Sequence, residues 1–159
     1  MIHKPAVSSP AAAAALKLFV VLSRAQIAVS RHSEGDVARH GLTGTEFAIL
    51  EVLYHRGPLL LGEVQRKILV SSGGITYLVD RLEKRGLVER RPCADDRRAR
   101  YAALTPEGEA LIGRIFPDHA KALTRAVSGL SRAEQAQATA LLRKLGKAAE
   151  ELPVAEPAA

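Results

Sequence analysis

The sequence predicts a mostly α-helical fold with one small β-hairpin. Apolar residues recur at helical spacing over most of the chain, and two short segments near its middle show the apolar pattern of strands. The length of 159 residues and an apolar fraction of 47% fit one globular domain and argue against a disordered chain. We expect a flexible arm over residues 1–10, a single domain over 11–151 and a flexible tail over 152–159.

Composition limits the classes of function. The net charge is +6, and the segment from Arg81 to Arg100 alone holds eight basic and four acidic residues. Such a local basic footprint suits a polyanionic partner, although a charge run by itself is more often a solvated surface. The single cysteine excludes an internal disulfide scaffold. An aromatic content of 4% without tryptophan disfavours a stacking platform for single-stranded nucleic acid.

The first predicted helix covers residues 11–39. Its positions at helical spacing are Leu16, Phe19, Val20, Ser23 and Ile27. Lys17 interrupts the apolar run, only Lys4 precedes it, and no A-x-A cleavage site follows closely, which disfavours a signal peptide. The run is also shorter than the ~20 apolar residues that a membrane span needs. We therefore expect a helix that is buried against another surface, in a cytoplasmic protein without a membrane partner.

A capping box marks the start of the second helix. In the pattern T-x-x-E the Thr43 hydroxyl accepts a hydrogen bond from a free backbone N–H, and the Glu46 carboxylate reaches back to the N-cap. Gly57 and Pro58 end this helix. Its expected apolar face consists of Phe47, Leu50, Leu53 and Tyr54. A short third helix is expected over about residues 61–68.

The fourth helix is predicted to be amphipathic. It is expected to begin near Ser71 or Ser72, since serine is a favourable N-cap, and to end at Gly86 with a left-handed C-cap. Its buried stripe is predicted to consist of Ile75, Leu78, Val79 and Leu82. Polar and partly basic positions are left for the opposite face. Two short strands over 87–91 and 99–104, joined by a polar loop, are expected to follow.

Two longer helices complete the chain. The fifth helix is predicted to begin at Thr105 and Pro106, because proline is favoured at the first helical position, and to run to about Ser128. A second capping box, formed by Ser131 and Glu134, is predicted to open a sixth helix that extends to about residue 151.

The segment over residues 61–104 has the properties of a reader of double-stranded DNA. An amphipathic helix fits the ~12 Å wide major groove and touches base edges with its N-terminal residues. A hairpin tipped by Arg97 and Arg98 is able to place an arginine in the adjacent minor groove. We expect the remaining basic residues to be free for phosphates; these are Lys84, Arg90, Arg91 and Arg100.

Three stretches of sequence carry a family resemblance. They are L-T-x-x-E-F over 42–47, L-V-D-R-L-E-K-R-G-L-V over 78–88, and D-D-R-R followed by L-T-P-E-G over 95–108. With this order of helices and hairpin, the chain resembles the MarR family of winged helix-turn-helix regulators from about residue 16 to 151. Within that family, G-G-I-T-Y over 73–77 and R-P-C over 91–93 resemble repressors that respond to quinones and related small aromatic compounds.

The resemblance implies an architecture and a mechanism. It implies long dimerisation helices over 11–39 and 106–151, a winged helix DNA-binding part over 43–104, and a homodimer on a roughly palindromic operator. It also implies a ligand cleft between the dimerisation helices and the DNA-binding part. The output it implies is repression, relieved when a small phenolic or quinone-like ligand changes the spacing of the two DNA-binding parts. From the absence of a nucleotide fingerprint and of a metal-ligand set in the sequence, we expect no cofactor and no metal ion.

The resemblance also assigns site residues. On the recognition helix they are Ser72, Gly73, Thr76, Tyr77 and Arg81. At the hairpin tip it assigns DNA contact to Arg97 and Arg98, and it assigns Asp96 the role of ordering the wing by pairing with an arginine. Tyr77 stands where many relatives carry a basic residue, and it cannot make the bidentate contact that an arginine makes with guanine. We expect Asp80 to pair with an arginine of the protein, because phosphates repel a carboxylate.

Other functions were weighed against DNA binding. A small helical redox enzyme or transferase is disfavoured, since the sequence shows neither a nucleophile–base pattern nor a nucleotide fingerprint. A winged helix that binds proteins has no need for basic residues at Arg97 and Arg98. Cys93 lies among arginines and is a candidate redox sensor, but a lone cysteine in a wing is more often incidental. No histidines are spaced i, i+4, so we expect no zinc site.

Overall fold

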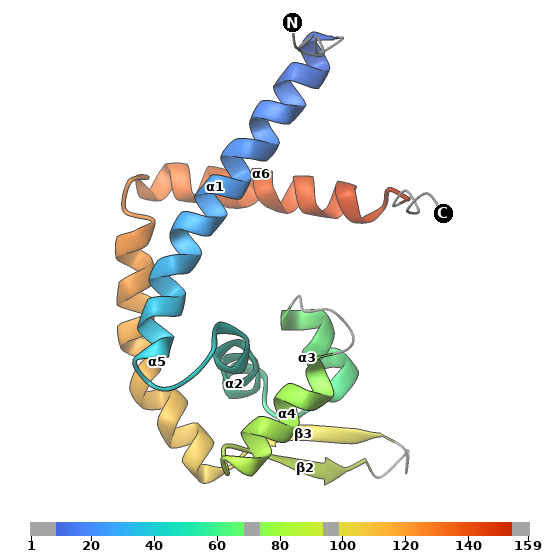
Figure 1. The fold of residues 1–159 in the computed structure, drawn as a ribbon, viewed down its shortest axis with the longest axis vertical. Helices are drawn as coiled ribbons and strands as arrows, with labels where there is room; N and C mark the ends of the chain where they lie inside the picture. Colours follow the sequence, from blue (N-terminus) through green and yellow to red (C-terminus); the bar gives the residue numbers. More distant parts are fainter. Residues whose placement is uncertain (1–8, 69–73, 94–98, 154–159) are drawn as a thin grey trace, which may run out of the picture. The chain divides into compact units, whose positions relative to one another are not determined.

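The structure is a computed structural model, and it describes residues 9–68, 74–93 and 99–153 (Figure 1). Its helices and strands are α1 (Pro10–Ala38), α2 (Gly44–Arg56), β1 (Leu59–Leu60), α3 (Leu61–Ile68), α4 (Ile75–Lys84), β2 (Val88–Pro92), β3 (Arg100–Leu104), α5 (Pro106–Ala126) and α6 (Arg132–Glu150). The chain packs as two compact units, Met1–Leu123 and Thr124–Ala159. The predicted class, mostly α with a small β-hairpin, is confirmed.

Helix α1 is 29 residues long and begins where the Ser9 hydroxyl accepts a hydrogen bond from the Ala12 N–H. Only Asp36 and Val37, near its C-terminal end, are buried. Most of the large apolar residues along the rest of the helix are exposed in the single chain, with Phe19 at 68%. An 18-residue window has a mean hydropathy of 1.6, so by length and composition the helix could cross a membrane. Core helices of soluble proteins meet the same criterion of length and composition, so the expectation of a helix that does not span a membrane stays a prediction.

The start of α2 confirms the predicted capping box. The Glu46 N–H donates to Thr43 Oγ1 at 3.2 Å, and the Thr43 N–H donates to Glu46 Oε2 at 2.8 Å. The helix ends at Gly57, whose φ of +74° is in the left-handed region that favours glycine. Tyr54 was predicted on the apolar face but is exposed, because it lies in the last turn, beyond the buried Leu53.

The core of the first unit is formed by the inner faces of α2, α3, α4 and the small sheet together with residues of α1 and α5. Of the predicted stripe of the fourth helix, Ile75, Val79 and Leu82 are buried, and Leu78 is partly buried against the core. The described helix begins at Ile75 with Gly74 at the N-cap, and not at Ser71 or Ser72, which lie outside the described residues. Gly86 follows the helix with a φ of +69°, which confirms the predicted left-handed turn.

The sheet has three antiparallel strands in the order β1-β3-β2. In the hairpin, Val88 pairs with Leu104 and Pro92 pairs with Arg100. On the other edge of β3, Leu59 pairs with Ala102. Strand β1 is absent from the sequence prediction, because two residues are too few to show an alternating pattern.

The L-T-P-E-G stretch joins the start of α5 to the turn that follows α4. The Thr105 hydroxyl donates to the Gly86 carbonyl at 2.6 Å, and the Thr105 N–H donates to the Leu87 carbonyl at 3.2 Å. Gly108 packs directly on this turn, since a Cβ at that position would lie 2.0 Å from the Leu87 carbonyl oxygen. The glycine is therefore required by a close backbone approach, which explains its spacing from the threonine.

A buried polar pair joins the C-terminal end of α1 to α5. Asp36 Oδ2 lies 3.3 Å from His119 Nδ1, and both side chains are buried. The His119 ring also packs on Phe47 of α2, with 4.3 Å between ring centroids. Arg39 forms an ion pair with Asp36 from the solvent side. The contacts of His119 were not predicted, because they join residues far apart in the sequence.

In the second unit, α6 begins with the second predicted capping box. The Ser131 N–H donates to Glu134 Oε2 at 2.8 Å, and the Glu134 N–H donates to Ser131 Oγ at 3.4 Å. Hydrogen bonds from the Ser131 side chain and backbone lower the pKa of the Glu134 carboxyl. Helix α6 has no buried residue in the single chain, and its leucines are exposed; these are Leu141, Leu142 and Leu145.

Candidate nucleic-acid interface

Helix α4 presents one polar face to solvent. The apolar face holds the buried residues Ile75, Val79 and Leu82, which fix the helix on the core. Thr76 and Tyr77 lie on the other face and are exposed, with Tyr77 at 62%. The ring and hydroxyl of Tyr77 are therefore accessible to another molecule.

Arg81 is one helical turn beyond Tyr77 on α4. Its side chain is 43% exposed, and its Nη2 lies 3.2 Å from Oε1 of the buried Glu46 on α2. Its guanidinium carbon lies 5.9 Å from the centroid of the Tyr77 ring, within the range of a cation–π contact. Arg81 is thus held between a buried carboxylate and an exposed aromatic ring.

Arg90 of β2 is held by acidic residues of α4. Its Nη2 lies 2.6 Å from Asp80 Oδ1, and its Nη1 forms a further ion pair with Glu83. It also donates to the Thr76 carbonyl at 3.4 Å. The expectation that Arg90 is free for a phosphate is therefore wrong, because two carboxylates already neutralise it. The expectation that Asp80 pairs with an arginine of the protein is confirmed.

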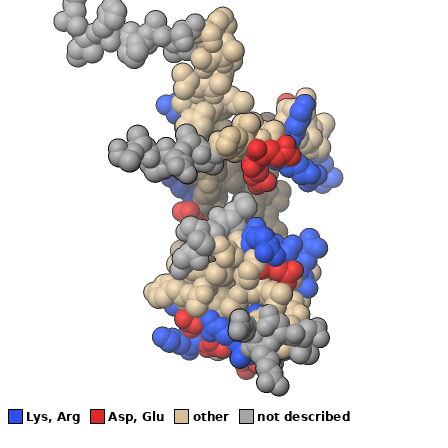
Figure 2. All heavy atoms as spheres, turned by 90° about the vertical axis from the view of Figure 1, so that its right-hand side faces the viewer, with Lys and Arg blue, Asp and Glu red and all other residues tan. Residues whose placement is uncertain are grey.

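The other basic residues of the hairpin are exposed. Arg91 forms an ion pair with Glu89 at 2.6 Å, and Arg100 donates to the Ala99 carbonyl at 3.1 Å. Lys84, in the last turn of α4, is exposed too. Figure 2 shows lysine and arginine side chains on this face next to aspartate and glutamate side chains. The basic excess of the segment is therefore partly balanced locally.

Five of the predicted site residues lie outside the described residues; these are Ser72, Gly73, Asp96, Arg97 and Arg98. Their contacts stay predictions from the sequence. Cys93, at the edge of the described hairpin, lies with its sulfur 3.9 Å from the Tyr101 hydroxyl. Among residues 9–68, 74–93 and 99–153, no three histidine, cysteine or acidic side chains gather as a metal site.

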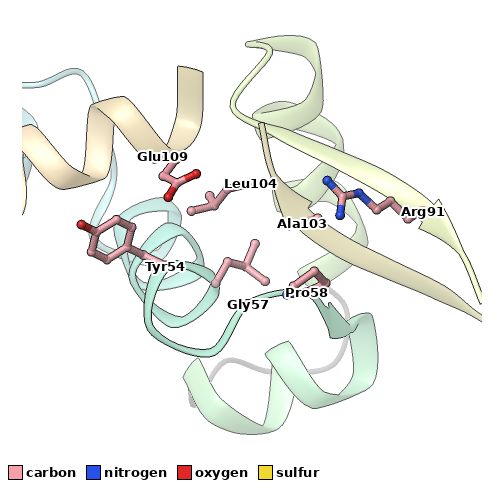
Figure 3. A pocket seen from close by; sticks show the side chains of 8 residues that line it. Tyr54, Gly57, Pro58, Arg91, Ala103, Leu104 and Glu109 are labelled. Carbon is pink, nitrogen blue, oxygen red and sulfur yellow. The ribbon is translucent and has the colours of Figure 1, made fainter. Parts of the chain in front are cut away.

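A cleft opens between the end of α2, strand β3 and the start of α5 (Figure 3). Its volume is about 230 Å³, below the ~300–1,000 Å³ typical of sites for drug-sized ligands. Tyr54 and Glu109 lie at one end and Arg91 at the other, as Figure 3 shows. Tyr54 also packs on α5, since a Cβ at Gly113 would lie 3.4 Å from its hydroxyl. The cleft lies between α5 and the DNA-binding part, where the resemblance implies a ligand cleft, and its lining residues were not assigned from the sequence.

Comparisons with known proteins identify the family. The model of the MarR family matches residues 40–99, which include α2, α3, α4 and β2. The HTH-type transcriptional regulator MhqR of Bacillus subtilis strain 168 is 44% identical over 131 residues, which cover 82% of this chain and 90% of MhqR. The chain belongs to the MarR family. It is accordingly a DNA-binding transcriptional regulator, and the fold described above is the winged helix of that family.

Solved structures of DNA-binding regulators have the same fold. Sco3205 of Streptomyces coelicolor, a MarR family regulator solved in complex with DNA, has a TM-score of 0.77 at 23% identity, over 92% of each chain. BpsR of Bordetella bronchiseptica has a TM-score of 0.72 at 28% identity, over 79% of this chain and 90% of that one. In the resemblance described above, α4 takes the place of the expected recognition helix and the β2–β3 hairpin takes the place of the wing.

Sequence reasoning missed the residues that hold this interface together. Glu46 was identified only as a helix cap, and Glu83 and Arg85 received no role. Each pairs with a residue from another element: Glu46 with both Arg81 and Arg85, and Glu83 with Arg90. The signal available in the sequence is the density of opposite charges in the fourth helix and the strand after it. That signal shows that pairs form but not which ones.

Proposed function

We propose that this MarR regulator is a cytoplasmic homodimer that represses transcription from a roughly palindromic operator. A small phenolic or quinone-like ligand releases it by changing the spacing of its two recognition helices. Operator half-sites on one face of DNA lie ~34 Å apart, so a small change of spacing is enough to lose the register. The observation that carries the proposal is the polar face of α4, where Thr76 and Tyr77 are exposed beside Arg81.

The exposed apolar residues support a dimer. Phe19, Leu16 and Ile27 of α1 are all more than half exposed, and so is Leu141 of α6. A soluble protein rarely leaves so many large apolar side chains in water, and burying each one contributes ~1.5–3 kcal/mol. A second copy of the chain is the partner that supplies the same helices and covers the same residues in both subunits.

The ligand class is supported by the sequence and by one relative. Residues 73–77 and 91–93 resemble quinone-responsive repressors, as noted above. The structure of BpsR was solved to explain how 6-hydroxynicotinic acid, a hydroxylated aromatic acid, regulates its DNA binding. We extend that class of ligand to this chain.

A gel-shift titration tests the proposal directly. The probe is the duplex that flanks the protein's own gene, and an unrelated duplex of the same length and base composition is the control. We expect a discrete complex with the first probe, which small phenols or quinones dissolve at concentrations that leave the folded protein intact. Equal binding of both duplexes would contradict sequence-specific regulation, and complexes that no such compound affects would contradict the ligand class.

Replacing Thr76 with alanine is expected to change the preferred sequence more than the general affinity for DNA. Thr76 lies on the exposed face at the N-terminal end of α4, where a recognition helix touches base edges. Its contact discriminates between bases but adds little to the attraction of phosphates. Binding selection from a pool of random duplexes measures the preference. An unchanged consensus sequence would show that Thr76 reads no base.

Replacing Arg98 with alanine is expected to weaken operator binding and to lower its dependence on salt. The slope of log affinity against log salt concentration falls by about one for each phosphate contact that is lost. Arg98 lies outside the described residues, so this expectation comes from the sequence alone. Fluorescence anisotropy at four salt concentrations measures the slope. A variant with the wild-type slope would remove Arg98 from the DNA contacts.

A further inference from the structure

The side chain of Glu46 is fully buried, yet it carries a charge that the helix cap alone does not require. We propose that Glu46 is a positioning residue of the DNA interface. Its carboxylate holds Arg81 in the place from which the recognition helix reads DNA. This inference rests on the proposed sequence-specific function of α4 and adds to it the residue that orients one of its contacts.

The two oxygens of Glu46 have different tasks. Oε2 accepts a hydrogen bond from the Thr43 N–H at 2.8 Å and so completes the capping box of α2. Oε1 is buried and has no hydrogen-bond partner, although Nη2 of Arg81 lies 3.2 Å away. A buried carboxylate oxygen without any compensating partner is costly. The charge of Arg81 therefore offsets the free-energy cost of burying this oxygen, and the two side chains hold each other in place.

The geometry of this pair leaves Arg81 able to contact DNA. The contact with Oε1 is an ion pair without hydrogen-bond alignment, so it locates the guanidinium without using up its five N–H donors. The guanidinium also lies near the ring of Tyr77, which is on the exposed face of α4. Glu46 thereby sets the position of Arg81, and Arg81 limits the orientations of Tyr77.

A second arginine links the same carboxylate to the chain between α1 and α2. Nη1 of Arg85 lies 3.8 Å from Glu46 Oε2 and donates a hydrogen bond to the Gly41 carbonyl at 3.0 Å. Arg85 is at the C-terminal end of α4, directly after Lys84. The carboxylate is thus paired with arginines from two successive turns of the recognition helix, and it holds that helix on the N-terminus of α2.

The substitution Glu46→Gln separates this role from helix capping. Glutamine closes a capping box as glutamate does, because its amide oxygen accepts the same hydrogen bond. It removes only the charge that attracts Arg81 and Arg85. The loss of a negative charge near the interface favours binding to any DNA, whereas a misplaced Arg81 weakens binding to the correct sequence alone. A role in positioning therefore lowers specificity without lowering general affinity.

The experiment compares the full-length protein, Glu46→Gln and Glu134→Gln. Glu134 closes the same kind of capping box in α6 but is exposed, so it is the matched control. The probes are the duplex that the wild type selects from a random pool and a scrambled duplex of equal length. For Glu46→Gln we expect the ratio of the two affinities to fall about tenfold, with binding to the scrambled duplex equal to wild type or stronger. Glu134→Gln is expected to keep the wild-type ratio.

A double-mutant cycle shows whether Glu46 acts through Arg81. In the Arg81→Ala background, Glu46→Gln is expected to cause no further loss of specificity, since the group it positions is gone. In the free protein, NMR of the arginine Nε–Hε groups is expected to show shifted Arg81 and Arg85 signals in Glu46→Gln but not in Glu134→Gln.

Two results would overturn the inference. The first is an unchanged ratio of the two affinities for Glu46→Gln, and an unchanged ratio with equal losses for both duplexes indicates a purely structural role. The second is unchanged Arg81 signals in the free protein, a measurement that needs no DNA. A wild type that selects no sequence contradicts the proposed function instead, and the NMR comparison then still decides whether Glu46 positions Arg81.

Discussion

Replacing Gly108 with alanine is expected to destabilise the first unit by about 2–4 kcal/mol, because a new methyl group must displace backbone atoms. The Cβ would lie 2.0 Å from the Leu87 carbonyl oxygen and 2.9 Å from its carbonyl carbon. Neither atom is able to rotate away as a side chain does. Leu87 also accepts the hydrogen bond of Thr105, so moving it loosens the junction of α4, β2 and α5.

Urea unfolding at one fixed protein concentration measures the loss, since a dimer's stability depends on its concentration. Gly35→Ala is the matched control. Gly35 lies within α1 and its added Cβ meets nothing within 4 Å in the single chain. There the exchange is expected to be neutral or to stabilise by up to ~1 kcal/mol, as alanine favours helix. Equal urea midpoints of unfolding for Gly108→Ala and the wild type would show that the backbone at Leu87 moves aside at little cost in free energy.

The elements that the sequence predicted well carry their signals locally. The third helix lies at the predicted residues, and both capping boxes form where T-x-x-E and S-x-x-E occur. Gly86 ends α4 because a left-handed residue is needed there. These features depend on residues within four positions of one another, so the sequence pattern alone predicts them. Strand β1 depends on pairing with β3 and has only two residues, so its own sequence contains no such signal.

In the candidate site too, the feature set by nearby residues was predicted and the contacts between distant residues were not. The exposure of Thr76 and Tyr77 follows from the spacing of buried residues on the same helix, and it was predicted. The partners of Arg81 and Arg90 were not, although both arginines were identified as important. An arginine in a basic stretch has the same appearance in a sequence whether it faces phosphate or a carboxylate of its own chain. Only the fold decides, by bringing Glu46 or Asp80 within reach.

Introducing charge on the apolar face of α1 is expected to separate the dimer. The double variant Leu16→Asp and Phe19→Asp places two carboxylates at residues that are 55% and 68% exposed in the single chain. If a second subunit covers them, both charges must be buried without partners, and the cost exceeds what the remaining interface supplies. We expect sedimentation equilibrium to show a monomer at concentrations where the wild type is a dimer.

The same variant is expected to bind its operator at least ~100-fold more weakly, because each half-site then binds its recognition helix independently. Lys17→Asp is the control: it adds negative charge to the same stretch of α1, but at a position that is already charged and solvated. An intact dimer in the double variant would exclude this face from the interface.

Hydropathy alone also allows α1 to cross a membrane, and this experiment decides between a dimer interface and a membrane span. A helix whose apolar face covers a second subunit yields a soluble wild-type dimer and a soluble monomeric variant, whereas a membrane helix requires detergent in the wild type and loses that requirement when two aspartates are introduced.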